Sequence, residues 1–247
     1  MEVWIPILRE TFGDGLVGVY LYGSLTQGAF NARRSDVDVL VVVRRSLTRR
    51  QFEQLGGLLE RAAEADKWIR RIQMQILIRD RLLRSDDRGA NFQFGVLTRS
   101  GSDGNPLIWI NVLDSGITLA GVRAESILPP ITKRMVRAAL IREIEYLRVE
   151  IANPASPWRD KRFYRAYAVL TVCRILYTLS LGSIVSKPRA SAWALRELPP
   201  RWQSLIRAAR ASDRGHMAPL PLPRIAHFVA YGAEISAALR ARSGLAN

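Results

Sequence analysis

Two short stretches are the most informative about the fold: VGVYLYGS at residues 17–24 and SDVDVLVVV at residues 35–43. Each contains a compact run of β-branched and aromatic residues, which is typical of a buried β-strand. The first run ends in a Gly-Ser turn, and the second is entered through Ser-Asp-x-Asp. Two apolar strands with these motifs in this order are rare by chance. They predict a sheet with two carboxylates at the start of one strand.

Asp36 and Asp38 stand at positions i and i+2 of the second strand. Side chains at this spacing share one face, with Cα atoms about 6.6 Å apart. Two adjacent carboxylates are unfavourable unless a cation lies between them, and oxygen ligands without His or Cys select Mg²⁺ or Mn²⁺. Mg²⁺ keeps positions open for substrate phosphates, which a Gly23-Ser24 turn can hold. The alternative is a solvated strand end beside an ordinary turn.

The composition excludes several other kinds of site. The chain has 247 residues, one cysteine (Cys173) and two histidines (His216 and His227). A disulfide framework and a Cys-rich zinc site are excluded, and little room is left for His-based chemistry. Hydrophobic residues make up 48% and charged residues 24%, as in soluble globular proteins. Catalysis is therefore expected to depend on carboxylates.

No segment is expected to enter a membrane. Glu2 and Pro6 interrupt the N-terminal residues, which do not form a secretory signal. The most apolar stretch, residues 166–181, is shorter than a membrane span and carries Arg174. We expect a cytoplasmic monomer.

Lys and Arg outnumber Asp and Glu by 37 to 22, which gives a net charge of +15. Such an excess favours polyanionic partners such as nucleic acid or a nucleoside triphosphate. Codon bias is an explanation of equal weight, because 33 of the 37 basic residues are arginines. The sequence shows no basic strip interleaved with aromatic residues, so a nucleic-acid partner is not expected.

The first half alternates predicted strands and helices. Strands are predicted over residues 17–22, 37–43 and 72–78. A helix between the second and third opens with Thr48-Arg-Arg-Gln51, which predicts a capping box. Residues 91–121 stay unassigned, because several glycines and a proline cut them into short pieces.

Tandem prolines, Pro129 and Pro130, mark a boundary after which apolar residues recur at helical spacing. Helices are predicted over residues 136–151, 162–181, 190–198 and 225–239, with a turn at 219–223 before the last. The chain is thus expected to be an α+β protein. An N-terminal α/β domain with a mixed sheet (residues 1–129) would precede an all-α helical bundle (residues 130–247).

At these motifs the chain resembles the DNA polymerase β-like nucleotidyltransferases, and most closely the aminoglycoside nucleotidyltransferases that adenylylate streptomycin and spectinomycin. The resemblance is carried by LYGS (21–24), SDVD (35–38), FQFG (92–95), RILYT (174–178), GSIVSK (182–187) and AWAL (192–195). The last three are more specific than the Asp-x-Asp motif. The resemblance implies a two-domain resistance enzyme that uses ATP and two Mg²⁺ ions to transfer AMP to a drug hydroxyl.

The resemblance also implies roles for single residues. Asp36 and Asp38 would hold the metal ions, and the nucleotide would be bound by Gly23, Ser24, Ser35, Arg174 and Lys187. The chemistry of Arg174 and Lys187 supports these two roles. Arg174 is the one charge in an apolar segment and needs an anion, and Lys187 stands at a predicted helix N-terminus, where anions bind. A structural salt bridge for Arg174 and a solvated Lys187 are the alternatives.

One catalytic position departs from the resembling family. Where that family has a glutamate as general base, this chain has Gln73, or Gln75 if the register differs by two. Glutamine cannot accept a proton, so the chemical step should lose most of the 10²- to 10⁴-fold contribution of a base. Three explanations stay open: an engineered Glu-to-Gln change, which we favour; another base, namely Glu143, Glu145 or Asp160; or nucleotide binding without efficient turnover.

The acceptor is predicted less sharply. Asp160 matches a drug-contacting aspartate of the resembling family, with Trp158 close by as a packing surface, but Asp160 could equally start a helix. The family's tryptophan after Phe-Gly-Glu is replaced, since residues 94–97 read FGVL, and Tyr164 stands at an acidic position. These departures leave the drug open. Nucleotide transfer to RNA or protein is the alternative function.

Overall fold

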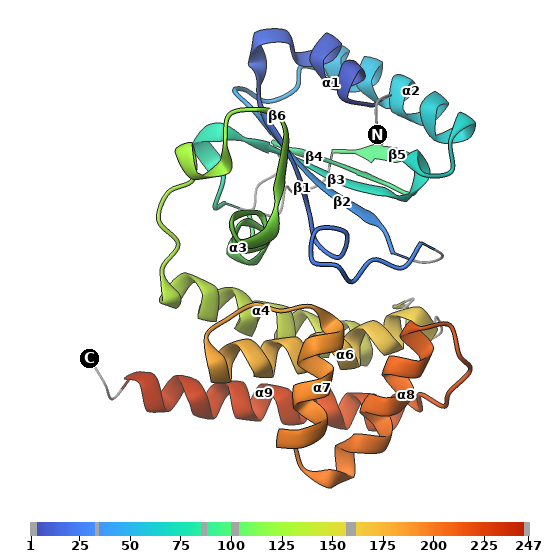
Figure 1. The fold of residues 1–247 in the computed structure, drawn as a ribbon, viewed down its shortest axis with the longest axis vertical. Coiled ribbons are helices and arrows are strands. Elements are labelled where there is room, and N and C mark those ends of the chain that lie inside the picture. Colours follow the sequence, from blue (N-terminus) through green and yellow to red (C-terminus); the bar gives the residue numbers. More distant parts are fainter. Residues whose placement is uncertain (1–3, 33–34, 85–87, 100–103, 157–161, 245–247) are drawn as a thin grey trace. The chain divides into compact units, whose positions relative to one another are not determined.

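The computed structural model describes residues 4–32, 35–84, 88–99, 104–156 and 162–244. The chain divides into two compact units, residues 1–131 and residues 132–247. The first unit is built on a mixed β-sheet, and the regular structure described in the second is helical (Figure 1). The expected α+β class is therefore confirmed.

Six strands form the sheet of the first unit in the order β5-β4-β3-β2-β1-β6. Their bounds are β1 Leu16–Tyr22, β2 Val37–Val43, β3 Ile72–Ile78, β4 Ala90–Gln93, β5 Val96–Thr98 and β6 Ile117–Gly121. Only β2 and β3 pair in parallel; the other neighbours are antiparallel. A parallel pair needs a crossover, and α2 (Arg49–Ala65) supplies it. The three predicted strands are confirmed, with β1 one residue longer.

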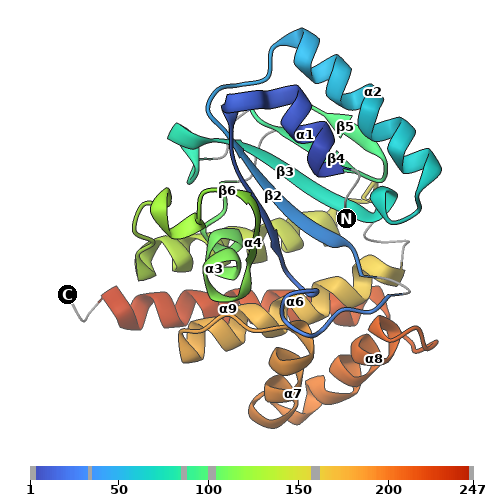
Figure 2. The ribbon, with the colours of Figure 1, turned by 45° about the horizontal axis from the view of Figure 1, so that its top comes forward.

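Strand β2 is apolar toward both faces of the sheet, as expected for a strand beside a parallel partner. Val39 and Val41 pack beneath α1 (Trp4–Phe12) and α2, whereas Leu40 and Val42 pack with Trp109 of α3 (Pro106–Ser115). Figure 2 shows α1 and α2 over one side of the sheet and α3 on the other. Polar side chains at the start of β2 therefore interrupt an otherwise buried strand.

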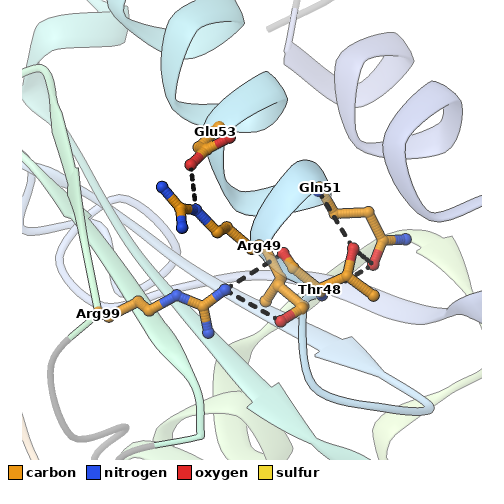
Figure 3. A network of polar contacts seen from close by, with 6 residues as sticks. Thr48, Arg49, Gln51, Glu53 and Arg99 are labelled. Atoms are coloured by element: carbon orange, nitrogen blue, oxygen red, sulfur yellow. Dashed lines mark hydrogen bonds and ion pairs between the residues drawn. The ribbon is translucent and has the colours of Figure 1, made fainter.

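Helix α2 begins at the predicted capping box (Figure 3). The Thr48 hydroxyl accepts a hydrogen bond from the Gln51 backbone N–H at 3.2 Å, and Gln51 Oε1 accepts one from the Thr48 N–H at 3.1 Å. Arg99, which follows β5, donates to the carbonyls of Leu47 and Thr48 and lies over the ring of Phe52. These contacts fix the point at which the chain leaves β2 and enters the crossover.

The unassigned segment after residue 90 folds into a hairpin, a helix and an edge strand. Phe94 and Gly95 have φ values of 55° and 86° and form the tight turn between β4 and β5. Asn105 caps α3 through a hydrogen bond from the Leu107 N–H, and Pro106 occupies its first turn. The elements are three to ten residues long, so periodicity alone could not identify them.

The second unit packs its helices around α6. The helices are α4 Lys133–Ala152, α6 Arg162–Leu181, α7 Lys187–Glu197, α8 Gln203–Asp213 and α9 Leu222–Gly244. The four predicted helices are confirmed. Helices α4, α7 and α9 each begin three residues before the apolar pattern that predicted them, and α7 begins at Lys187, the predicted helix N-terminus. Helix α8 was not predicted, because alanine and arginine dilute its apolar face of Leu205 and Ile206. Among the described helices, none has both the length and the apolar character to cross a membrane.

Candidate active site

The two aspartates lie where β2 begins. Asp38 is the second residue of β2 and stands opposite Tyr22 of β1 and Gln73 of β3, while Asp36 immediately precedes the strand. Both side chains are half-buried. By the alternation of β2 they share the face that carries Leu40, on the α3 side of the sheet. The structure therefore brings the two carboxylates to one face, as their spacing predicts.

Gly23 lies against one of these carboxylates. Its φ of +80° is unfavourable for any residue with a side chain, and a Cβ built on it would lie 2.1 Å from Asp38 Oδ2. The turn after β1 is closed by hydrogen bonds from Gln27 N to Gly23 O (3.1 Å) and from Ala29 N to Ser24 O (2.9 Å). A Gly-Ser turn thus directly adjoins Asp38.

Ser35 holds the other side of this loop. Its hydroxyl accepts a hydrogen bond from the Asn31 N–H at 2.9 Å, which leaves its own O–H as a donor. Arg71, just before β3, donates to the carbonyls of Ser35 and Ala32 and lies over the ring of Trp68. The loop that leads into Asp36 is therefore tied to the start of β3.

Gln73, rather than Gln75, is the amide beside the aspartates. Its Nε2 donates a hydrogen bond to Asp36 Oδ2 at 2.8 Å, and it pairs in register with Asp38. Gln75 pairs two residues further along, with Leu40 and with Asn91 of β4. An ionised glutamate at position 73 could not donate this hydrogen bond, because it carries no proton. With glutamine, the site combines the carboxylates of Asp36 and Asp38 with one neutral amide donor.

These residues suit a metal ion that is shared with a substrate. In the described part of the chain, no group of three or more His, Cys, Asp or Glu side chains is placed to hold a metal. Two carboxylates on one strand face are the set that Mg²⁺ takes when substrate phosphates complete its shell. Asp36 and Asp38 therefore fit Mg²⁺ held jointly with a polyphosphate.

In the second unit, Arg174 lies half-buried on α6. Within the described residues its guanidinium has no hydrogen-bond or ion-pair partner. The alternative offered by the sequence, a structural salt bridge, is therefore not seen among these residues. A half-buried guanidinium with five N–H donors is costly unless an anion accepts them. Arg174 is thus available to bind one.

Lys187 is the first residue of α7, and Pro188 follows it in the first turn. Ser186 stands at the N-cap but makes no side-chain capping bond, so its hydroxyl does not take a first-turn N–H. The Lys187 ammonium lies 4.4 Å from the ring centroid of Tyr167. Tyr167 and Arg174 are seven residues apart on α6 and share one face. Sequence reasoning missed Tyr167; its spacing from Arg174 was the available signal.

The structure says less about the predicted drug contacts and the alternative bases. Trp158 and Asp160 lie outside the described residues. Of the alternative bases, Glu145 accepts hydrogen bonds from the Arg148 guanidinium on the exposed side of α4, and these hold the pKa of its carboxyl below the usual range. A lowered pKa makes Glu145 a poor proton acceptor. Glu143 lies partly buried on α4.

Known proteins resemble both halves of the chain. Residues 4–90 match the nucleotidyltransferase domain family, and residues 126–233 match the family described as aminoglycoside adenylyltransferase, C-terminal domain. The chain is 27% identical over 231 residues to a spectinomycin 9-adenylyltransferase of Staphylococcus aureus, covering 85% of this chain and 83% of that protein. It is also 27% identical over 229 residues to an aminoglycoside (3'') (9) adenylyltransferase of Klebsiella pneumoniae, with the same coverage.

A solved structure shares the fold. The crystal structure of a spectinomycin adenyltransferase from Enterococcus faecialis, with ATP and spectinomycin, superposes with a TM-score of 0.73. The match covers 94% of this chain and 96% of that one at 20% sequence identity. The chain is therefore similar to these proteins both in sequence and in fold.

Proposed function

The chain belongs to the aminoglycoside nucleotidyltransferases, and from this membership we propose that it transfers AMP from ATP to a hydroxyl of a streptomycin- or spectinomycin-type antibiotic and so confers resistance. The observation that carries the proposal is the pair Asp36 and Asp38 on one strand face, with Gly23 packed against Asp38. The crystal structure of the Enterococcus relative, which contains ATP and spectinomycin, supports the choice of substrates.

The nucleotide phosphates would be bound by hydroxyl, backbone N–H and cationic groups. In the first unit, Ser24 and Ser35 offer hydroxyl donors beside the carboxylates, and the Gly23 turn offers backbone N–H groups. In the second unit, Arg174 offers positive charge on α6, and Lys187 offers it at the first turn of α7. These are donors and cations only, which is the chemistry that a triphosphate needs.

Asp36 and Asp38 would hold Mg²⁺, two ions in this proposal. When bound there, Mg²⁺ neutralises the negative charge on the attacking and leaving oxygens around the α-phosphorus. The two carboxylates fix its position, since one adjoins the Gly23 turn and the other accepts the Gln73 amide. In-line attack by the drug hydroxyl forms the bond to phosphorus and breaks the bond to pyrophosphate.

Gln73 sets the rate of this reaction. It lies where the resembling family places a glutamate base, and its amide can orient the accepting hydroxyl but cannot take its proton. That proton would pass to water. We therefore propose slow turnover, lower by about 10²-fold or more than with a carboxylate at this position.

The experiment is mass spectrometry of an aminoglycoside panel incubated with ATP and Mg²⁺. The chain is compared with Gln73→Glu, and Asp36→Asn in each background is the matched control. A drug that gains one AMP, faster with Gln73→Glu and not with Asp36→Asn, is the expected result. No adduct with either form, while ATP still binds in a Mg²⁺-dependent way, would replace transfer by nucleotide binding alone.

A further inference from the structure

The positive charge of the chain is concentrated in the helical unit. Residues 132–247 contain 20 basic and 7 acidic residues, a net charge of +13, whereas residues 1–131 contain 17 and 15, a net charge of +2. The arginine counts are nearly equal, 17 and 16. A codon bias toward arginine therefore cannot account for the difference, which comes from the scarcity of carboxylates in the helical unit.

The proposed substrates do not explain this charge. Two cations, Arg174 and Lys187, are assigned to the nucleotide, and an aminoglycoside is itself a polycation that a field of this sign repels. A further polyanionic partner would explain it. The described part of the helical unit carries exposed cations that no carboxylate neutralises.

Such cations gather where α8 and α9 meet the short 3-10 helix Pro200–Trp202. The Arg224 guanidinium donates to the Arg201 carbonyl at 2.9 Å and to the Ser204 hydroxyl at 3.1 Å. The Arg201 guanidinium lies over the rings of Trp202 (5.1 Å) and Tyr231 (5.5 Å). Both arginines are exposed. Sequence analysis could not find this cluster, because its residues come from separate segments.

These arginines are ordered without being neutralised. In the described part of the chain, neither forms an ion pair with a carboxylate, and Arg207, exposed on α8, bonds only to the amide oxygen of Gln203. Stacking and backbone bonds restrict the long side chains in advance, so less entropy is lost when a ligand binds. The remaining N–H donors face solvent, where a phosphate oxygen can accept them.

We propose that this surface, composed of Arg201, Ser204, Arg207 and Arg224, binds the phosphate backbone of RNA. Guanidinium planes stack with unpaired bases as well as bonding to phosphates, and Arg201 presents such a plane on an aromatic support. An anionic membrane is less suited. None of the described exposed large apolar side chains belongs to α8 or α9, and a membrane surface needs such side chains to insert.

The test is fluorescence anisotropy with a labelled single-stranded RNA of about 20 nucleotides, at about 50 to 200 mM KCl. Three guanidinium contacts predict a slope of log affinity against log salt near −2, since each neutralised phosphate of a single strand contributes about −0.7. Arg201→Gln with Arg224→Gln should reduce the slope to about −0.7. The control, Arg45→Gln with Arg50→Gln, removes the same charge from exposed arginines of the first unit and should leave the slope unchanged.

Three results would overturn the proposal. RNA fails to bind at the lowest salt, or the control variant loses as much slope as the test variant, or phosphatidylserine vesicles bind and RNA does not. Arg207→Glu, which changes one exposed residue of the surface, provides a second variant should the double variant not fold. AMP transfer by all variants is expected to match that of the parent, so a failure of the proposed transferase reaction would be seen separately.

Discussion

Gly23 is the residue on which the geometry of the carboxylate pair depends. Its missing side chain leaves the space in which the Asp38 carboxylate lies, and its positive φ turns the chain from β1 into the Ser24 loop. Gly28, later in the same loop, also has a positive φ, of +65°, but a Cβ added there would meet nothing within 4 Å. Substitutions at the two glycines can therefore distinguish the effect of backbone strain from the effect of direct contact with Asp38.

Gly23→Ala should weaken Mg²⁺-dependent ATP binding by about tenfold or more, because the new methyl group must displace the Asp38 carboxylate. Gly28→Ala carries the same kind of backbone strain, about 1 kcal/mol, without the displacement. Isothermal titration of ATP with Mg²⁺ measures both variants. Equal losses of affinity would show that strain alone acts at Gly23.

Gln73→Glu should change stability in a metal-dependent way. The glutamate loses the 2.8 Å hydrogen bond to Asp36 and adds a like charge, which lowers the free energy of unfolding by about 1–3 kcal/mol without metal. Mg²⁺ should recover most of this loss. Thermal unfolding with EDTA and with Mg²⁺ tests the expectation, and a variant equally stable in both would contradict it.

Cys173 should report on global unfolding. It is buried in α6, and burial raises the pKa of its thiol to about 12. The native thiol therefore stays protonated and shielded at pH 8, and its reaction with Ellman's reagent should follow the unfolding rate. Above pH 9 the unfolded chain ionises first, so stability should fall as pH rises toward 12. Cys173→Ala should abolish the labelling and reduce the loss of stability above pH 9, while burial of Tyr20, which raises the pKa of its hydroxyl to about 12, keeps a share of that loss above pH 10. Rapid labelling of the folded chain would disprove the first effect.

Within the site, spacing along one strand was a reliable guide. The positions of Asp36, Asp38 and Gln73 relative to one another follow from strand alternation and from a parallel neighbour, both of which are local rules. The contact of Lys187 with Tyr167 was not predictable, because it depends on how α7 returns along α6. Roles for Trp158 and Asp160 stay predictions.

At the scale of elements, α6 and α7 act together through one ring. The Tyr167 ring lies beneath the Lys187 ammonium at the start of α7, on the α6 face that also carries Arg174. A cation held over an aromatic face is attracted by about 0.5–2 kcal/mol. Tyr167 therefore positions Lys187, to which the proposed function assigns the binding of a nucleotide phosphate.

Tyr167→Leu should weaken ATP binding by about 2- to 30-fold, whereas Tyr167→Phe, which keeps the ring, should leave the affinity near that of the parent. In turnover the loss should appear in KM for ATP rather than in kcat. Lys187→Ala measures the full contribution of the lysine to ATP affinity. In that background Tyr167→Leu should have no further effect, and an additive loss would mean that the tyrosine acts by another route.

Elements with strong periodicity were predictable and short ones were not. Strand β2 and the middle of α6 are nearly continuous apolar stretches, and β3 alternates apolar and polar residues before it becomes apolar, so the sequence pattern identifies all three. Helix α1 was missed because Pro6 lies inside it, and β5 and β6 because a strand of three to five residues at a sheet edge has too little pattern. Their positions depend on pairing partners far away in the chain.

At the scale of the whole molecule, each unit contains what it needs to fold. The first has apolar clusters on both faces of its sheet, and the second has a core around α6 that includes Leu170, Leu205 and Phe228. Core packing of this kind is the main source of stability for a domain of 100–150 residues.

Residues 132–247 expressed alone are therefore expected to fold as a helical domain with cooperative thermal unfolding, and residues 1–131 as an α/β domain. Far-UV circular dichroism of each fragment during heating tests this. The boundary expected from the tandem prolines, after residue 129, would gain support from fragments that melt cooperatively. A broad transition in either fragment would mean that the units depend on each other for stability.

Gln73, which donates a hydrogen bond to Asp36, can be replaced by glutamate through one base change. Glutamine and glutamate codons differ only in their first base, and the two side chains have nearly the same shape. Asp36 and Asp38 already lie beside this position. Under the proposed reaction, a gene that encodes glutamine at position 73 is a single transversion away from a carboxylate there, and exposure to the drug would select that change.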